Sequence, residues 1–198
     1  LSALGLLIEE QRTNLATYSQ DLSNAVWAKS GSSVSLVAAS APDGGGAYKL
    51  VENSATSDHR VSTVATVSIG QAYSTAIYAK QAGRTAIKFY ANMQGGTKSF
   101  VVDLVTGAVS GSSMPSAPVV SNAGGGYWRI AYTETADITS IIGLNIVLLN
   151  GGAESYLGDG ASGVYIWGAQ LEAGSFATSY IPTTSASVTR AADSATMT

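Results

Sequence analysis

The sequence predicts an all-β fold, a two-sheet antiparallel jelly-roll β-sandwich that forms one domain. Stretches of alternating apolar and polar residues recur about every 10 to 15 residues, a spacing typical of sandwiches and barrels. Charged residues make up only 12% of the 198-residue chain, roughly half the usual share of about 25%. The apolar fraction of 45% provides enough apolar surface for one sizeable core.

Ten ranges carry the alternation and are the expected strands. Along the fourth of them Tyr78 and Lys80 share one face, and along the fifth Lys88 and Tyr90 do. Lysine on these faces marks them as the wetter sides of the strands. The ten ranges are 33–38, 47–52, 59–67, 71–80, 85–92, 98–104, 117–121, 127–134, 142–149 and 163–172.

Glycine-rich turns connect these ranges, because glycine adopts the positive φ values that tight β connections need. Helical signals are few. The range 21–29 is compatible with one short helical turn that has Asp21 or Ser23 as its N-cap. The range 136–142 fits either a helical turn or the start of a strand. The expected turns are 42–46, 94–97, 106–107, 124–126, 150–152 and 158–160.

The two ends of the chain differ in composition from the middle. Residues 1–12 open with an apolar run, and residues 182–198 are rich in Ser, Thr and Ala. We expect both ends to be linkers or segments that pack against neighbouring domains, with the sandwich spanning 13–181. The chain begins at Leu1 without a signal-peptide pattern, which we interpret as an excised or processed piece of a larger protein.

Composition excludes several classes of partner. The net charge is −3 and the pI is near 5.0, and the ten Lys and Arg residues are scattered singly, so the basic stripe that nucleic acids require is missing. The longest apolar run, from Ile138 to Leu149, is short and interrupted by polar residues, so we expect no membrane span. The lack of cysteine excludes disulfides and thiolate metal sites.

Several motifs occur together over nearly the whole chain. They are the opening run Gly5–Leu15 (GLLIEEQRTNL), Tyr18-Ser19, Trp27, Ala41–Gly44 (APDG), Tyr78–Lys80 (YAK), Phe100–Asp103 (FVVD) with Thr106-Gly107, Gly126–Arg129 (GYWR), Tyr165–Gly174 and Tyr180–Thr183 (YIPT). This set resembles a jelly-roll domain recurrent in bacteriophage tail-fibre, tail-spike and head-spike proteins. That domain is in turn similar to the non-catalytic carbohydrate-binding modules appended to bacterial xylanases.

The resemblance implies a module for glycan binding or adhesion on the outside of a virion. Its partners would be a bacterial surface glycan, the neighbouring domains of a larger fibre protein, and two further copies of itself in a homotrimer. The opening apolar residues also fit self-association, since they would otherwise leave an exposed patch. These residues are Leu4, Leu6, Leu7 and Ile8.

The resemblance also bears on cofactors. The related sugar-binding modules often carry an Asp in the last core strand, where it helps to hold a structural calcium. Here the corresponding run from Tyr165 to Gln170 has no carboxylate, and the first one is Glu172. We therefore expect no cofactor, with a structural calcium as the less favoured alternative.

The sequence offers few groups for catalysis. His59 is the only histidine, at a strand start between Asp58 and Arg60, and there is no Gly-x-Ser-x-Gly elbow. One histidine without cysteine does not supply the common zinc ligand sets. Two facing carboxylates would suffice for glycoside hydrolysis, but most acids here lie in turns, where they usually act as turn formers. We therefore expect no enzyme, and a polysaccharide hydrolase or lyase ranks third among the functions.

Aromatic side chains are the candidate sugar contacts, because a flat ring covers the apolar face of a pyranose. Trp128 and Trp167 lie within expected strands and are expected to be mainly in the core. Trp27 follows a polar stretch, and we expect it nearer the surface, where it would contribute to a binding site.

The main candidate site combines Tyr78, Tyr90 and Asn92 with Lys80 and Lys88. If their two strands pair, these residues form one shallow patch, and its lysines suit an acidic polysaccharide. The alternative is that the tyrosines only pack beneath a loop or against another subunit. The leading hypothesis is recognition of a bacterial surface glycan, and the alternative is a purely structural virion module for fibre spacing or trimerisation.

Overall fold

The structure is a computed structural model that describes residues 8–91, 98–137 and 140–194. These residues contain no helix, and so none long and apolar enough to cross a membrane. The strands in chain order are β1 (Arg12–Asn14), β2 (Ala28–Ser30), β3 (Ser32–Ser40), β4 (Gly46–Glu52), β5 (Thr56–Asp58), β6 (Arg60–Thr66), β7 (Ala72–Ala82), β8 (Ala86–Ala91), β9 (Lys98–Asp103), β10 (Val109–Ser110), β11 (Val119–Gly124), β12 (Tyr127–Thr135), β13 (Ser140–Leu149), β14 (Ser155–Leu157), β15 (Gly163–Ala173) and β16 (Val188–Arg190).

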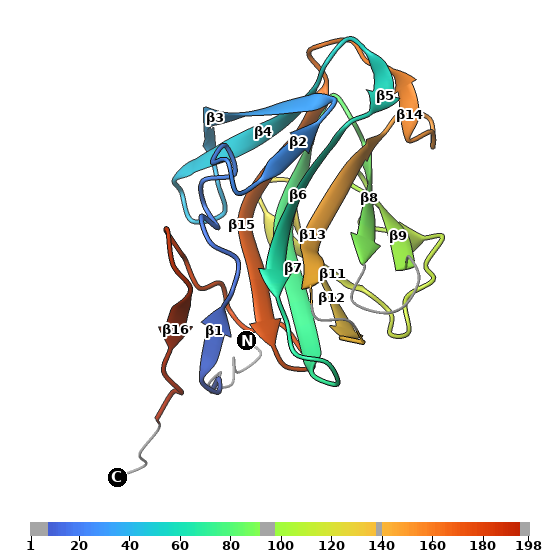
Figure 1. Cartoon of the computed structure of the whole chain (residues 1–198). Coiled ribbons are helices and arrows are strands. Elements are labelled where there is room, and N and C mark those ends of the chain that lie inside the picture. The colour runs from blue at the N-terminus through green and yellow to red at the C-terminus, as the bar shows by residue number, and fades with distance from the viewer. Residues whose placement is uncertain (1–7, 92–97, 138–139, 195–198) are drawn as a thin grey trace, which may run out of the picture.

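The strands form a sandwich of two six-stranded antiparallel sheets (Figure 1). One sheet, here called the β8 sheet, has the order β10-β9-β8-β13-β6-β2. The other, the β7 sheet, has the order β11-β12-β7-β15-β4-β3. Two short ribbons, β1-β16 and β5-β14, complete the fold. The expected jelly-roll sandwich is confirmed.

The core lies between the two sheets and consists of side chains that the alternation assigned to the apolar faces. Ile77 of β7 and Phe89 of β8 are fully buried. The Phe89 ring stacks on Phe100 with centroids 4.9 Å apart, and Tyr132 meets Phe100 edge-on at 5.3 Å. Burying one such side chain contributes about 1.5–3 kcal/mol, so this cluster fixes which residues of each strand face outward.

All ten expected ranges are strands, with ends that differ by a few residues. The six strands that the sequence did not predict have two or three residues each, too few for an alternation to show. The range 21–29 contains turns followed by β2 rather than a helical turn. Asp21 and Asn24 accept hydrogen bonds from the backbone two residues ahead, which competes with helix formation.

The glycine-rich segments turn the chain as expected. Gly44, Gly107, Gly124 and Gly151 all have positive φ values. Gly107 is required for a second reason, because a Cβ there would lie 2.5 Å from the ring of Trp128. The expected turn at 94–97 lies outside the described residues.

The strands nearest the two ends of the chain, β1 and β16, lie side by side and pair (Figure 1). The carboxylate of Glu9 forms an ion pair with Arg190, with 2.6 Å between Oε2 and Nη1. The completely buried side chain of Asn14 donates to the carbonyls of Ala169 and Ile181. Both ends therefore contact the domain itself, and the boundaries at 13 and 181 stay a prediction.

The apolar run at the start of the chain is described only at its last residue. Leu4, Leu6 and Leu7 lie outside the described residues, and Ile8 is 59% exposed. Self-association through this run stays a prediction.

Candidate functional site

The sequence-predicted site residues lie on two different faces of the sandwich. β7 pairs with β12 and β15, whereas β8 pairs with β9 and β13. The strands 71–80 and 85–92 do not pair, so the prediction of one patch that depended on their pairing is wrong. Tyr78 and Lys80 face outward from one sheet, and Lys88 and Tyr90 face outward from the other. Asn92 lies outside the described residues.

Trp27 is not near the surface, and this expectation is also wrong. Its side chain has no exposed area and belongs to the inter-sheet core. The indole Nε1 donates to the carbonyl of Tyr18 at 3.1 Å, so the polar end of the ring is satisfied inside the protein. The polar residues around Trp27 make turns above it, which is why the local sequence suggested exposure.

The other two indoles are covered in different ways. Trp128 is half-buried against the core, and its Nε1 donates to the carbonyl of Leu104 at 2.9 Å. Trp167 is 5% exposed but lies outside the inter-sheet core, in a cluster with Tyr127, Tyr78 and Tyr180 on the outer face of the β7 sheet.

The outer face of the β8 sheet, here called the β8 face, carries two rows of mostly polar residues. The register aligns Val101, Lys88, Val147, Arg60 and Ser30 in one row across five strands. A second row on the same face lies two residues along each strand. It contains Ser99, Tyr90, Asn145, Ser62 and Ala28. The β8–β13 pairing ends at Phe89–Ile146, and Tyr90 and Asn145 are the next residues of their two antiparallel strands.

Tyr90, Lys88 and Glu154 form the most ordered polar cluster of the β8 face. Glu154 comes from the connection between β13 and β14. It accepts hydrogen bonds from the Tyr90 hydroxyl at 2.5 Å and from Lys88 Nζ at 2.7 Å. Lys88 Nζ also lies 4.7 Å from the centre of the Tyr90 ring, so cation and ring hold each other in place.

Electrostatics keep this cluster ionised at neutral pH. Desolvation alone would raise the pKa of Glu154, but the hydrogen bonds from Lys88 and Tyr90 outweigh it, and the pKa is lowered. The hydrogen bond to Glu154 raises the pKa of Lys88. Burial, together with the same carboxylate, raises the pKa of Tyr90, so its hydroxyl stays a donor. The cluster thus offers a ring, an anion and a cation in fixed positions.

Sequence reasoning missed three residues of the β8 face, namely Glu154, Asn145 and Arg60. Glu154 reaches Tyr90 from a connection 64 residues away in the chain, and no local pattern signals such a contact. Asn145 did carry a signal, because it is the polar residue within an otherwise apolar strand. Arg60 was considered only as a neighbour of His59.

The outer face of the β7 sheet is partly covered by the chain's own C-terminal segment. The ring of Trp167 contacts Tyr78 at 5.1 Å and Tyr180 at 4.6 Å between ring centroids. Gly168 permits this packing for two reasons. Its φ of +66° is a conformation that favours glycine, and a Cβ added there would lie only 3.2 Å from the Tyr78 ring. The geometry favours the packing role for Tyr78.

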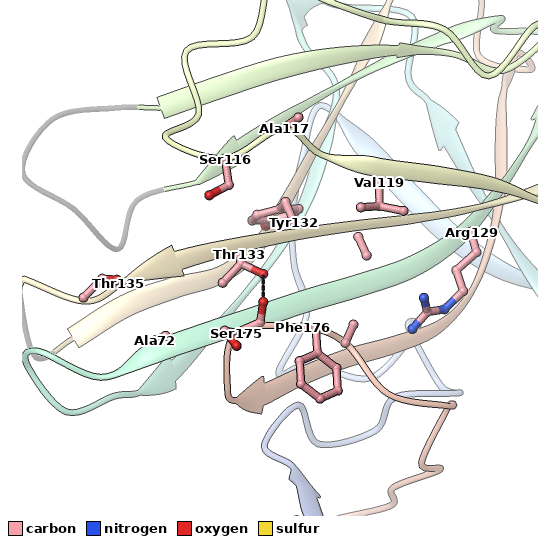
Figure 2. Close-up of a pocket in the computed structure, with 12 residues that line it drawn as sticks. Ala72, Ser116, Ala117, Val119, Arg129, Tyr132, Thr133, Thr135, Ser175 and Phe176 are labelled. Carbon is pink, nitrogen blue, oxygen red and sulfur yellow. Dashed lines mark hydrogen bonds between the residues drawn. The ribbon is translucent and has the colours of Figure 1, made fainter. Parts of the chain in front are cut away.

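A groove remains open beside that segment (Figure 2). Its volume is about 490 Å³, and β11, β12 and residues 175–177 line it. Val119 and Phe176 are exposed in it by 63% and 54%. Arg129 stands at one end and donates to the carbonyl of Thr178 at 2.7 Å. The groove is mostly apolar, and two aromatic residues, Tyr132 and Phe176, line it.

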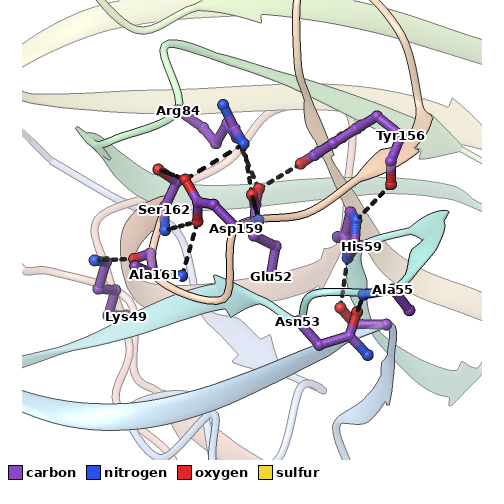
Figure 3. A network of polar contacts seen from close by, with 11 residues as sticks. Lys49, Glu52, Asn53, Ala55, His59, Arg84, Tyr156, Asp159, Ala161 and Ser162 are labelled. Atoms are coloured by element: carbon purple, nitrogen blue, oxygen red, sulfur yellow. Dashed lines mark hydrogen bonds and ion pairs between the residues drawn. The ribbon is translucent and has the colours of Figure 1, made fainter.

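A buried ionic network occupies one end of the sandwich (Figure 3). Glu52, 1% exposed, binds Arg84 through two hydrogen bonds of 2.7 and 2.5 Å. It also accepts the Tyr156 hydroxyl at 2.7 Å and the Asp159 amide at 2.8 Å. Every lone-pair direction of this carboxylate is thereby engaged, which indicates a structural role.

His59 lies between β5 and β6 and is completely buried. Its Nδ1 faces the carbonyl of Gly31 at 2.5 Å, and its Nε2 faces the carbonyl of Tyr156 at 3.2 Å. Both ring nitrogens are therefore engaged with the backbone, and neither reaches a serine or a metal ligand. Among the described residues no group of three or more His, Asp or Glu side chains is placed to hold a metal ion.

Comparisons with known proteins agree with the fold. No protein-family model matches the sequence, and no curated protein matches it. Among solved structures, the carbohydrate-binding module TmCBM61 in complex with β-1,4-galactotriose is similar at a TM-score of 0.51 and 10% identity, over 81% of this chain and 99% of that chain. This likeness shows a jelly-roll sandwich of the kind found in carbohydrate-binding modules.

Two longer proteins contain a similar region. The enzymatically active domain of tailspike protein 4 of bacteriophage CBA120 matches at a TM-score of 0.49 and 12% identity, over 83% of this chain and 21% of that chain. The CBM22-1 and GH10 modules of Clostridium thermocellum xylanase 10B, complexed with xylohexaose, match at 0.45 and 12%, over 88% of this chain and 30% of that chain. The chain thus spans less than a third of either protein.

Proposed function

We propose that this domain is a non-catalytic glycan-binding module and that the glycan lies on the β8 face. The observation that carries the proposal is the Tyr90–Lys88–Glu154 cluster. A tyrosine ring with an adjoining carboxylate and ammonium supplies an apolar platform together with an acceptor and a donor for sugar hydroxyls. The fold shared with a galactotriose-binding module supports the same function.

The geometry of the cluster suits a ligand that is mostly solvated. Glu154 and Lys88 keep 35% and 21% of their side chains exposed, so both can exchange water for sugar hydroxyls without moving. The mutual contacts already fix the rotamers of Tyr90 and Lys88, so little entropy is lost when a sugar binds. Single sugar contacts are weak, and a long glycan would gain affinity by contacting several residues of the row.

Replacing Tyr90 by alanine should weaken binding to a responsive polysaccharide, found on an array of bacterial surface glycans, by about five- to thirtyfold. The loss corresponds to about 1–2 kcal/mol for one stacked ring. Isothermal titration calorimetry on the purified domain measures it. Tyr90→Phe keeps the ring and loses only the hydrogen bond to Glu154, so it should bind more tightly than Tyr90→Ala.

Tyr78→Ala is the matched control, because it removes the same ring from the opposite face. It should bind the glycan as the unchanged domain does. Normal binding by Tyr90→Ala would refute the proposed site, and loss of binding by a folded Tyr78→Ala would place the site on the β7 sheet. A circular dichroism spectrum of each variant shows whether its fold is retained.

We further propose that the domain works in the fibre or spike of a bacteriophage, as one part of a homotrimer on a bacterial surface. The support is the set of opening and closing motifs, which resembles phage fibre domains. The runner-up function, a structural spacer, is favoured by the apolar groove at Val119 and Phe176, which offers a surface for a neighbouring subunit.

Self-association should appear in sedimentation velocity as a faster species that grows with protein concentration, with a trimer as the leading state. The double variant Val119→Ser with Phe176→Ser should reduce it if the groove is the contact. Reduction by Ile8→Ser instead would place the contact at the opening apolar run. A domain that stays monomeric at high concentration contradicts self-association of this domain on its own.

A further inference from the structure

The β8 face contains a small hollow next to the Tyr90 cluster. It lies between β2, β6 and β13 and has a volume of about 180 Å³. That is room for about six water molecules at their share of liquid volume, or for one charged group with part of a sugar ring. Its lining residues are Ala28, Lys29, Ser30, Arg60, Ser62 and Asn145.

Asn145 is the unusual member of this lining. Its side chain is only 4% exposed, and its Oδ1 has no hydrogen-bond donor among the residues that the structure describes. Buried acceptors are almost always paired, because leaving one unpaired is unfavourable. A hydroxyl group in the hollow would supply the missing donor.

The charged side chains that line the hollow are both cationic, although each has an acidic side chain nearby. Its lining contains two cations, Lys29 and Arg60, and no carboxylate. Arg60 forms an ion pair with Asp58 through Nε at 3.1 Å, and its side chain remains 43% exposed. Among the described residues its two terminal nitrogens enter no other ion pair, so the flat edge that grips a carboxylate is available.

Lys29 adds to this. Its Nζ donates to the carbonyls of Ser23 and Asn24 at 2.8 and 2.7 Å, and an ammonium has a third proton to donate. Burial lowers the pKa of Lys29, and the nearby charge of Asp21 only partly opposes this. A ligand anion would therefore stabilise a cation that is now partly desolvated.

From the unpaired acceptor and the two cations we propose that the hollow binds an acidic sugar residue, with the carboxylate at Arg60 and Lys29 and a ring hydroxyl at Asn145. This inference rests on the proposed glycan-binding function and deepens it, since it makes the glycan anionic. Asn145 adjoins Tyr90 in the same row, so adjacent sugar residues of one chain can occupy the ring platform and the hollow.

The test is a titration followed by ¹H–¹⁵N nuclear magnetic resonance with three probes, namely sodium D-glucuronate, D-glucose and sodium acetate. Glucuronate should shift the side-chain amide of Asn145 and the Nε–H of Arg60, with an affinity in the millimolar range. Glucose and acetate should each bind at least about tenfold more weakly, because each lacks one of the two kinds of contact. Equal shifts with glucose would overturn the acid requirement, and equal shifts with acetate would overturn the sugar requirement.

Two variants test whether glucuronate binds in the hollow. Arg60→Gln should reduce the glucuronate affinity about tenfold, and Asn145→Asp should reduce it at least as much by placing a like charge in the hollow. Arg129→Gln, on the opposite face, should change nothing. Glucuronate affinity that survives Arg60→Gln overturns the proposal, whether or not Asn145→Asp folds.

The experiments distinguish a failure of this inference from a failure of the proposed function. Tyr90→Ala should weaken polysaccharide binding and still show the glucuronate shift at Asn145. A shift at Asn145 without any polysaccharide binding would refute the proposed function and leave the hollow standing. Polysaccharide binding that depends on Tyr90, without any shift from glucuronate, would refute the hollow alone.

Discussion

Replacing Trp27 by alanine should lower the free energy of unfolding by about 3–5 kcal/mol. The indole is fully buried in the inter-sheet core, and its Nε1 donates to the carbonyl of Tyr18. Truncation leaves a large cavity and removes this hydrogen bond, while the Tyr18 carbonyl keeps the one from the Asp21 amide. The total stability of a domain is usually only about 5–15 kcal/mol. Urea denaturation followed by circular dichroism measures the change.

Phe176→Ala is the matched control for this prediction, because it removes an aromatic ring that is 54% exposed. Its cost should stay within about 1 kcal/mol, as for most surface substitutions. A cost for Trp27→Ala as small as that of the control would mean that the indole lies at the surface, as its polar neighbours suggest.

The alternation of apolar and polar residues determines each long strand, but not the sheet to which the strand belongs. A short connection of residues 83–85 joins β7 to β8, which resembles a hairpin in the sequence. In the structure Gly83, with a φ of +104°, lies in this connection, and the chain crosses from one sheet to the other. The alternation of buried and exposed residues is the same for a hairpin and for a crossover. The sequence therefore could not show whether Tyr78 and Tyr90 lie on the same face.

The residues that complete the candidate site come together only through long-range pairing. Lys88 and Tyr90 were predictable as outward-facing, because the period of two places them opposite Phe89. Glu154 and Arg60 join them from other parts of the chain, through the β8–β13 and β13–β6 registers. The burial of Trp27 also depends on residues distant in the sequence, since it packs in the core with side chains from both sheets.

The ionic network around Glu52 joins three segments that the sheets alone do not hold together. Glu52 ends β4, Arg84 lies in the β7–β8 crossover, and Tyr156 belongs to the β14 ribbon. The guanidinium of Arg84 also lies 5.0 Å from the centre of the Tyr156 ring. A buried ion pair contributes little more stability than a well-packed apolar pair. Removing one partner is nevertheless destabilising, because the other charge stays buried without its main partner.

Replacing Glu52 by alanine should therefore lower the free energy of unfolding by about 3–5 kcal/mol at neutral pH. The change leaves the guanidinium of Arg84, 14% exposed, with only the more distant and half-exposed carboxylate of Asp159 at 3.8 Å. It also unpairs the Tyr156 hydroxyl and the Asp159 amide. Urea denaturation measures it, with Glu10→Gln as the control, since the Glu10 side chain is 55% exposed. A loss no larger than that of the control would contradict the buried network.

Glu52→Gln should also change how stability depends on pH. Desolvation would raise the pKa of Glu52, but the hydrogen bonds from Arg84, Tyr156 and Asp159 lower it below its ordinary value of 4.5. The network's contribution is therefore fully present above pH 4.5 and is lost as the pH falls through the lowered pKa, because the unfolded chain takes up the proton first. The unchanged domain should thus lose more stability than Glu52→Gln between about pH 5 and pH 3. Parallel pH profiles of the two proteins over that window would show instead that the Glu52 carboxylate makes no favourable contacts in the folded state.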